Sequence, residues 1–322
     1  MVTGGAGFIG LHLVRKLINL DYEVFIVDNF YRGSLDRDFE LILRDQRAKY
    51  INVNLNEVDL SEILLESNID YIVHLAAIVG VKNVESNPLL VLDNNLSMLN
   101  GIIEFAKRQR NLKRLIFAST SEVYAGTLKF FGLEFPTKEN TPLAISSEFD
   151  KRTTYALSKI YGEYLCAFSN LPYTILRPHN VYGPRMGLDH LIPEQLRRIW
   201  SARDGQSLSV TSPKHQRTFI YIDDAVETIL RVMEQEKCEG KTLNLGCQKP
   251  EFTVLEVVQM CARIVGRNLQ IVEGEDMLGS PLRRVPSVEL LESLIEFKPK
   301  ISLEQGISLT YDWYRQGFSH KS

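Results

Sequence analysis

Three glycines near the start of the chain, Gly4, Gly7 and Gly10, constrain its fold more than any other feature of the sequence. Gly4 allows a tight turn out of a strand, Gly7 leaves space for a phosphate beside the backbone, and Gly10 lets a helix pack closely on that strand. The amphipathic stretch Leu11–Leu20 follows, and the N–H groups at the start of its helix face the turn. We therefore expect a strand, a phosphate-binding turn and a helix, which together begin a dinucleotide-binding fold.

An acidic residue ends the second candidate strand. Asp28 lies eighteen residues after Gly10, where a carboxylate accepts hydrogen bonds from the ribose hydroxyls of NAD and repels the 2′-phosphate of NADP. Arg32 supports the opposite preference, because a nearby arginine can accommodate that phosphate. On balance Asp28 favours NAD. The residues expected to hold NAD in this part of the chain are Gly4, Gly7, Phe8, Ile9, Gly10, Asp28 and Asn29.

Strand-like and helix-like segments alternate through the N-terminal half of the chain. The candidate strands are rich in Val, Ile, Leu, Phe and Tyr, and comprise Glu23–Val27, Ala48–Val53, Tyr71–Leu75, Arg114–Ala118 and Tyr173–Arg177. The helical patterns between and around them are Leu11–Leu20, Leu60–Ser67, Asn94–Arg108 and Tyr155–Phe168. This alternation predicts an α/β fold of Rossmann type, a doubly wound parallel sheet with helices on both faces. Only Met1 and Val2 precede the first turn, so the first strand is either very short or begins upstream.

The pattern changes after Pro178, where helices, short strands, prolines and loops are mixed. Helices are expected around Ile192–Ala202 and Val254–Ile264, while 218–222, 223–233 and 243–245 suggest a return to the central sheet. We expect an NAD-binding domain of residues 1–177 plus about 217–247. A smaller α/β lobe for the substrate is expected from about 178–216 plus 248–322.

The composition argues against several classes of partner. A formal net charge of −3 without a long basic block argues against nucleic acid and anionic membranes. The four cysteines form no CxxC pair, which argues against a metal site and fits thiols in a reducing cytoplasm. No apolar run reaches the roughly 18 residues that span a bilayer, and the start of the chain lacks a signal-peptide pattern. We expect a cytoplasmic protein with no metal.

A second motif carries the candidate chemistry. Tyr155 and Lys159 are four residues apart, so they share one face of a helix. A lysine ammonium and a positive nicotinamide ring are both expected to lower the pKa of the phenol, which can then act as a base. Ser119-Thr120-Ser121-Glu122 follows the strand Arg114–Ala118, at the carboxyl end where open α/β sheets bind ligands, and a hydroxyl there can orient a substrate oxygen.

In this order, these features resemble the extended short-chain dehydrogenases/reductases, a family of NAD-dependent nucleotide-sugar epimerases, dehydratases and decarboxylases. The resemblance covers essentially the whole chain. It includes His74-Leu75-Ala76-Ala77, Asn95, the segment Arg177-Pro178-His179-Asn180-Val181-Tyr182-Gly183-Pro184, the segment 217–224 and Arg283-Arg284-Val285-Pro286.

The resemblance implies roles for individual residues. It implies Tyr155 as the base, Lys159 as its partner, Thr120 as the hydroxyl that orients the substrate, and Glu122 as a further acid/base. Tyr155, Lys159, Leu75, Ala76, Ala77 and Asn95 are expected to contact NAD as well. The residues expected to bind a nucleotide-diphosphate sugar are Ser121, Glu122, Asn180, Arg217 and Arg284, with the guanidinium groups on phosphate oxygens.

The resemblance also implies a shared first step, in which the tyrosine takes the proton of the sugar 4-hydroxyl while hydride passes to NAD. Thr120-Ser121-Glu122-Val123-Tyr124 looks like the motif of UDP-glucuronate decarboxylases, whereas 4,6-dehydratases usually carry an Asp acid in the place of Ser121. We expect an epimerase, with a 4-dehydrogenase or a UDP-glucuronate-type decarboxylase as alternatives. The complete catalytic set argues against a non-catalytic NAD-binding scaffold. The motifs leave the base and the sugar open.

Two further expectations concern surfaces. Thr120 and Tyr155 are 35 residues apart, more than is usual in the family. The extra stretch carries Phe130, Phe131, Leu133 and Phe135, and it either forms a lid or pocket wall or packs on the second lobe. The resemblance also implies a homodimer through 94–108 and 155–168, because members of the family commonly pair through the corresponding helices. The apolar positions of the first helix, which exceed one buried stripe, are compatible with it. These positions are Leu96, Leu99, Ile102, Ile103 and Phe105.

Overall fold

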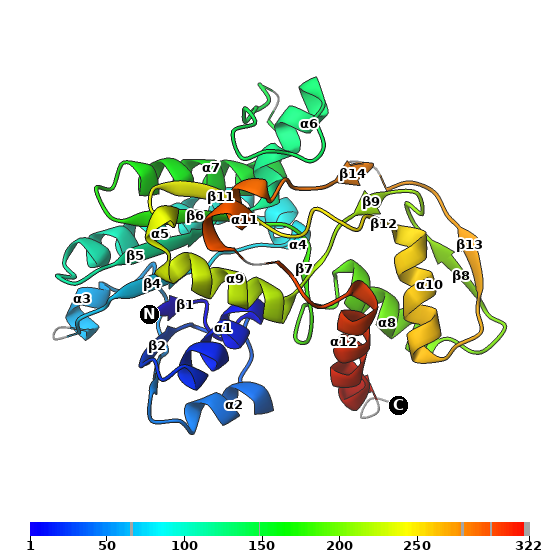
Figure 1. Ribbon diagram of the computed structural model, residues 1–322, viewed down its shortest axis with the longest axis horizontal. Coiled ribbons are helices and arrows are strands. Elements are labelled where there is room, and N and C mark those ends of the chain that lie inside the picture. Colours follow the sequence, from blue (N-terminus) through cyan, green and yellow to red (C-terminus); the bar gives the residue numbers. More distant parts are fainter. Residues whose placement is uncertain (65–66, 148, 278–279, 297, 319–322) are drawn as a thin grey trace.

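The computed structural model describes residues 1–64, 67–147, 149–277, 280–296 and 298–318. Its centre is a seven-stranded parallel sheet with the order β11-β6-β5-β4-β1-β2-β3 (Figure 1). The strands are β1 (Val2–Thr3), β2 (Val24–Val27), β3 (Ala48–Ile51), β4 (Tyr71–His74), β5 (Arg114–Ala118), β6 (Tyr173–Pro178) and β11 (Lys241–Leu245). The strand order reverses beside β1, and this reversal creates a crevice at the carboxyl ends of β1 and β4.

Helices cover both faces of this sheet (Figure 1). One face carries α1 (Phe8–Asn19), α2 (Arg37–Leu43) and α9 (Ile222–Glu234), and the other carries α3 (Leu60–Ile63), α5 (Pro88–Lys107) and α7 (Thr153–Ala167). Successive strand residues point to opposite faces: Ile116 packs in the core cluster with α1, whereas Leu115 and Phe117 pack in the cluster with α5. Both faces are therefore apolar, as in a buried parallel sheet.

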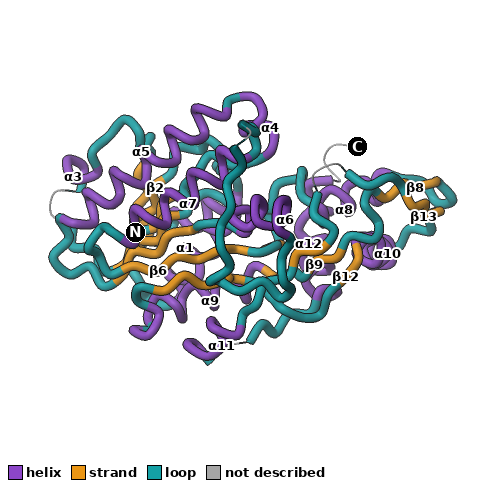
Figure 2. The backbone as a smooth tube through the Cα atoms, turned by 90° about the horizontal axis from the view of Figure 1, so that it is seen from above, coloured by secondary structure: helices purple, strands orange, loops and turns teal. Residues whose placement is uncertain are grey.

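A smaller lobe lies beyond one end of the sheet (Figure 2). Three of its helices pack together, α8 (Leu191–Ser201), α10 (Val254–Val265) and α12 (Leu303–Phe318). Its short strands pair as β7 (Val181–Tyr182) with β10 (Ile220–Tyr221), β8 (Ser207–Val210) with β13 (Gln270–Glu273), and β9 (Gln216–Arg217) with both β12 (Phe252–Thr253) and β14 (Arg283–Arg284). The remaining elements are α4 (Val81–Ser86), α6 (Ala125–Phe131), α11 (Glu289–Ile295) and the 3-10 turns Ser121–Tyr124 and Glu236–Cys238.

The predicted α/β Rossmann-type class is confirmed, and three details differ. The expected helix 94–108 begins earlier, at Pro88, whose fixed φ suits the first turn of a helix. Residues 220–221 pair with β7 instead of joining the central sheet, so only 241–245 return to it. In the expected helix 60–67 the structure assigns Leu60–Ile63, and residues 65–66 lie outside the described residues. Within the described ranges no helix is long and apolar enough to cross a membrane.

Candidate active site

The glycine-rich turn connects β1 to α1 and leaves no room for side chains. Gly4 has a φ of +68°, and a Cβ there would lie 2.8 Å from the amide nitrogen of Ala76. A Cβ on Gly10 would lie 2.1 Å from the carbonyl oxygen of Gly4, and one on Gly7 would lie 3.1 Å from that oxygen. The N–H groups of Phe8 and Ile9 begin α1 beside this turn. A cradle of bare backbone at a helix N-terminus fits a dinucleotide pyrophosphate.

Asp28 stands at the end of β2, beside this cradle. Its two carboxylate oxygens accept hydrogen bonds from the backbone N–H of Ala6 (3.0 Å) and of Phe30 (2.8 Å). Burial raises the pKa of Asp28, and these two hydrogen bonds oppose the rise. Burial lowers the pKa of Arg32, and Tyr155 and Asp189 oppose this change. The position of Asp28 favours NAD.

The loop after β4 forms the opposite wall of the cradle. The N–H of Leu75 donates to the carbonyl of Thr3 (3.1 Å), and the N–H of Ala76 donates to the Thr3 hydroxyl (3.3 Å). Asn95 of α5 binds both backbone groups of Ile78, at 2.7 and 3.1 Å, and also contacts Ser158. Asn95 therefore holds the loop that contains Leu75, Ala76 and Ala77, and its own contact with NAD stays a prediction, as does that of Asn29.

Thr120, Tyr155 and Lys159 come together at the carboxyl end of β5. The Thr120 hydroxyl lies close enough to the Tyr155 phenol to lower its pKa. The Lys159 ammonium donates to the carbonyl of Ala118 (2.7 Å) and lies 6.0 Å from the centre of the Tyr155 ring. Thr120 also caps the turn that follows, because its hydroxyl accepts from the N–H of Glu122 (3.2 Å).

The ionisation of this group is governed by burial. Burial raises the pKa of Tyr155 to about 12, and the lowering effects of Thr120 and Arg32 are smaller. Burial likewise lowers the pKa of Lys159 to about 8. Burial therefore dominates the pKa of Tyr155 in the protein without NAD, and the expected joint lowering by Lys159 and a bound nicotinamide ring stays a prediction.

A buried ion pair one helical turn after Lys159 was not predicted from the sequence. Glu163 lies one helical turn after Lys159 and accepts hydrogen bonds from the guanidinium of Arg177 on β6 at 2.8 and 2.6 Å. The Ser119 hydroxyl donates to the same carboxylate (2.6 Å), and Arg177 also donates to the Tyr124 hydroxyl (2.7 Å). The signal was present in the sequence, because an acid four residues after Lys159 must lie on the same face of the helix.

Most residues proposed to bind the substrate gather beside Thr120. Arg284 pairs with Glu122 (2.8 Å) and lies 3.5 Å from the Ser121 hydroxyl. Arg217 faces Arg284 in register on the neighbouring strand, and its guanidinium donates to the carbonyl of Pro281 (2.7 Å). The Asn180 amide donates to the carbonyl of Thr218 (2.9 Å). Arg284 and, through its interaction with Glu122, Arg217 therefore lie near the turn after Thr120, whereas the printed contact of Asn180 leads to Thr218.

The stretch between Thr120 and Tyr155 is tied to its surroundings. Thr137 exchanges backbone hydrogen bonds with Val285 and Ser287, both 2.8 Å, in the segment that follows Arg284. Leu133 packs against a small core cluster of Val123, Tyr124 and Ile160, whereas Phe131 at the end of α6 is exposed. Two roles were expected for this stretch, a lid or pocket wall and packing on the second lobe. The backbone hydrogen bonds of Thr137 fit the second role.

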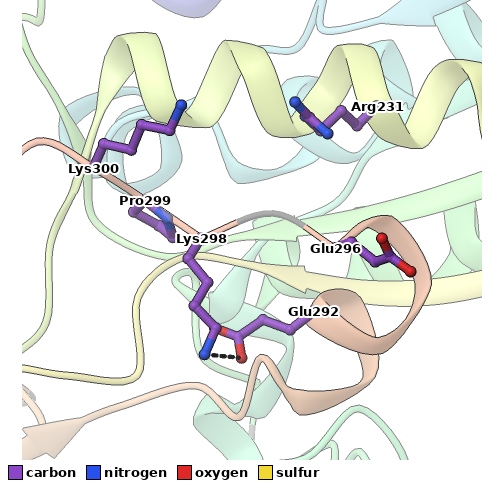
Figure 3. Close-up of a pocket in the computed structure, with 6 residues that line it drawn as sticks. All are labelled: Arg231, Glu292, Glu296, Lys298, Pro299 and Lys300. Carbon is purple, nitrogen blue, oxygen red and sulfur yellow. Dashed lines mark ion pairs between the residues drawn. The ribbon is translucent and has the colours of Figure 1, made fainter.

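A cavity of about 510 Å³ lies away from these residues. Figure 3 shows it between α9 and the segment around α11, where Lys298 pairs with Glu292. Its lining residues are Arg231, Glu292, Glu296, Lys298, Pro299 and Lys300. None of the catalytic candidates lines it, so it is separate from the candidate site. The described part of the chain also contains no cluster of His, Cys, Asp or Glu that could hold a metal.

Comparison with known proteins agrees with this geometry. The sequence model described as the NAD dependent epimerase/dehydratase family matches residues 1–246. The chain belongs to this family. Among its relatives is a UDP-N-acetyl-alpha-D-glucosaminuronate decarboxylase of Bacillus cytotoxicus, which is 33% identical over 98% of this chain and 97% of its own length.

Solved structures of the family superpose over the same span. A UDP-glucose 4-epimerase of Thermotoga maritima with UDP-glucose has a TM-score of 0.84 and 26% identity, covering 98% of each chain. A UDP-glucuronic acid 4-epimerase of Bacillus cereus with UDP-glucuronic acid and NAD has a TM-score of 0.81 and 27% identity, again covering 98% of each chain. The predicted family, the enzyme class and NAD as the cofactor are confirmed.

Proposed function

We propose that this member of the NAD dependent epimerase/dehydratase family oxidises the sugar of a UDP-sugar at C4 and re-reduces it, with inversion of C4 as the leading outcome. The observation that supports the proposal most is the Thr120–Tyr155 pair beside Lys159, next to a glycine cradle at the same sheet edge. The solved epimerases with UDP-glucose and UDP-glucuronic acid support UDP as the nucleotide.

Each residue of the catalytic group has a separate task. Tyr155 accepts the proton of the sugar 4-hydroxyl as C4 is oxidised, and it returns a proton to the same oxygen on reduction. Thr120 holds the phenol and the substrate oxygen in one hydrogen-bonded line. Lys159 is a buried ammonium fixed by Ala118, which favours negative charge on the neighbouring phenol. When bound, NAD accepts hydride from C4 and gives it back, and its oxidised ring adds positive charge beside Tyr155.

Arg217, Arg284 and Asn180 are proposed to clamp the substrate diphosphate. Burial lowers the pKa of Arg217 to about 10, so its charge is only partly compensated by its surroundings and a diphosphate is a suitable partner. Arg284 differs, because Glu122 neutralises it in an ion pair. A balanced pair next to Ser121 offers no free cation for a sugar carboxylate, and this favours a neutral sugar and hence epimerisation.

A second candidate function is the decarboxylation of a UDP-uronate. Its support is the decarboxylase relative from Bacillus cytotoxicus, which is 33% identical over 98% of this chain. A uronate carboxylate could displace Glu122 from Arg284, after which oxidation at C4 would produce a β-keto acid that loses CO₂. Glu122 would then be free to act as an acid/base beside the ketone.

Product analysis by proton NMR distinguishes the two functions. The protein with NAD is incubated with UDP-glucose, UDP-galactose, UDP-N-acetylglucosamine and UDP-glucuronate, and Tyr155→Phe is the control variant. We expect 4-epimers from a neutral UDP-sugar. A UDP-pentose with release of CO₂ would establish decarboxylation, and wild-type protein that converts none of these substrates would contradict the proposed function.

The remaining proposals concern assembly and location. We propose a homodimer through α5 and α7. The side chains that support it belong to the α7 region and not, as expected, to α5. Leu99, Ile102 and Phe105 are buried within the chain, whereas Tyr164 and Phe168 of the second helix region are 63% and 77% exposed. Light scattering at micromolar concentration tests the dimer. The four free cysteines support a reducing, cytoplasmic location, and the division into an NAD-binding domain and a nucleotide-sugar lobe also stays a proposal.

A further inference from the structure

Arg185 reaches from the second lobe into the wall of the cofactor cradle. It follows β7 and Gly183-Pro184 with a φ of +66°, and its side chain is only 5% exposed. The neighbouring backbone is fixed on both sides, because His12 of α1 hydrogen-bonds the Pro184 carbonyl (3.1 Å) and Tyr314 of α12 donates to the Met186 carbonyl. A strained, buried arginine held in this way has little freedom to adopt another position.

The guanidinium of Arg185 joins two loops that belong to the other lobe. It donates to the carbonyl oxygens of Ala6 (3.1 Å) and Gly7 (3.5 Å) in the glycine-rich turn, and to the carbonyl of Ser34 (3.1 Å) in the loop after β2. Its Nε donates to the carboxylate of Asp36 at 2.7 Å. The planar fork of an arginine suits several fixed acceptors at once, which a lysine cannot match.

This contact controls the direction of the backbone in the cradle. In a trans peptide the C=O of one residue and the N–H of the next point in opposite directions. The Gly7 carbonyl already accepts the first hydrogen bond of α1, from the N–H of Leu11 (3.0 Å), so Arg185 reinforces this direction at 3.5 Å and fixes the Ala6 carbonyl, at 3.1 Å, more closely. Gly33 supports the same arrangement, because a Cβ there would lie 2.8 Å from both the Cβ and the carbonyl oxygen of Ala6.

We infer that Arg185 is a positioning residue for NAD, through which the substrate lobe holds the pyrophosphate-binding turn and the loop after β2 in their binding arrangement. The inference rests on the proposed placement of NAD along this turn. Arg185 does not act mainly by its net charge, because Asp36 neutralises it. It acts by fixing the carbonyl groups of Ala6, Gly7 and Ser34, so its effect is specific for the dinucleotide.

Binding measurements on matched variants test the inference. Arg185→Gln removes the fork, while Asp36→Asn removes the opposing charge but keeps the fork and a good helix N-cap for α2. Arg203→Gln, at an exposed arginine of the same lobe, is the control. For each variant we would measure the Kd for NAD and for UDP by calorimetry, the Tm, and hydrogen exchange of the amides at 4–10.

We expect Arg185→Gln to weaken NAD binding about 10- to 100-fold and to speed exchange at 4–10, with UDP binding unchanged. Asp36→Asn and Arg203→Gln should bind NAD as the wild type does. Arg185→Lys should have an NAD affinity between those of the wild type and Arg185→Gln, and it replaces Arg185→Gln in the test if that variant does not fold. NAD affinity like that of the wild type in both Arg185 variants would overturn the inference. Equal losses of NAD and UDP binding in Arg185→Gln would also overturn it. The same holds if Arg185→Gln and Asp36→Asn weaken NAD binding equally. None of these readouts measures turnover, so they stand apart from whether the C4 chemistry is confirmed.

Discussion

Replacing Glu163 by Gln tests the buried support of the catalytic helix. The glutamate and Arg177 have side chains only 9% and 5% exposed, and they share two hydrogen bonds of 2.8 and 2.6 Å. A glutamine side chain has nearly the same shape, but its amide group donates toward a guanidinium that also donates. The substitution therefore leaves the positive charge of Arg177 buried without a counter-ion.

Loss of one partner of a buried pair destabilises a protein by about 3–5 kcal/mol. For a chain of this size, each kcal/mol lowers Tm by roughly 2–4 °C, so we expect a fall on the order of 10 °C by calorimetry. Glu104→Gln is the matched control, because Glu104 pairs with Lys107 on the surface at 63% and 46% exposure and its loss should cost about 0.5 kcal/mol or less.

The same substitution should move the pH profile of turnover. Burial lowers the pKa of Lys159 to about 8, against smaller raising effects of Cys166 and of the Glu163 carboxylate. Without Glu163 the pKa falls further, so Lys159 loses its proton at lower pH and the alkaline limb of kcat shifts downward. A double variant, Glu163→Gln with Arg177→Met, should recover part of the lost Tm. An unchanged Tm with an unmoved alkaline limb would refute the reasoning.

Three further substitutions address the site directly. Asp28→Ala should weaken NAD binding by roughly 1–3 kcal/mol, and an unchanged Kd for NAD by calorimetry would remove Asp28 from the ribose site. Tyr155→Phe should abolish turnover while NAD affinity and Tm stay near wild type, because only the ionisable oxygen is removed; near wild-type kcat would exclude Tyr155 as the base. Arg217→Ala should weaken UDP-sugar binding strongly and leave the Kd for NAD unchanged, whereas a parallel loss of both affinities would point to general damage to the lobe.

Features that depend on neighbouring residues were predictable from the sequence. Three local patterns carried the prediction: the glycine spacing, the alternation of strands and helices, and the four-residue step from Tyr155 to Lys159. Each restricts the structure through residues that are close together in the sequence. They led to the fold class and to the catalytic group. The roles of the catalytic, cofactor-binding and substrate-binding residues all stay predictions, although the structure brings Arg284 next to Glu122.

Features that depend on distant pairing were not predictable. Arg217 and Arg284 are neighbours only because β9 and β14 pair in register, and Arg185 meets Ala6 only after the two lobes dock. The pKa of Tyr155 depends on burial by residues from several segments, which no local pattern reports. The segment 220–221 was misplaced for a similar reason, because its apolar residues suit β7 as well as they suit the central sheet.

The proposed function requires that the sugar is oxidised at C4 and then reduced again by the same bound NAD. Its most direct test uses the UDP-sugar that the protein converts, labelled with deuterium at C4, with the product examined by mass spectrometry and proton NMR. We expect slower turnover of the labelled substrate and a product that retains deuterium at C4, for an epimer and a decarboxylated sugar alike. A product that carries solvent hydrogen at C4, or equal rates with loss of the label, would contradict it.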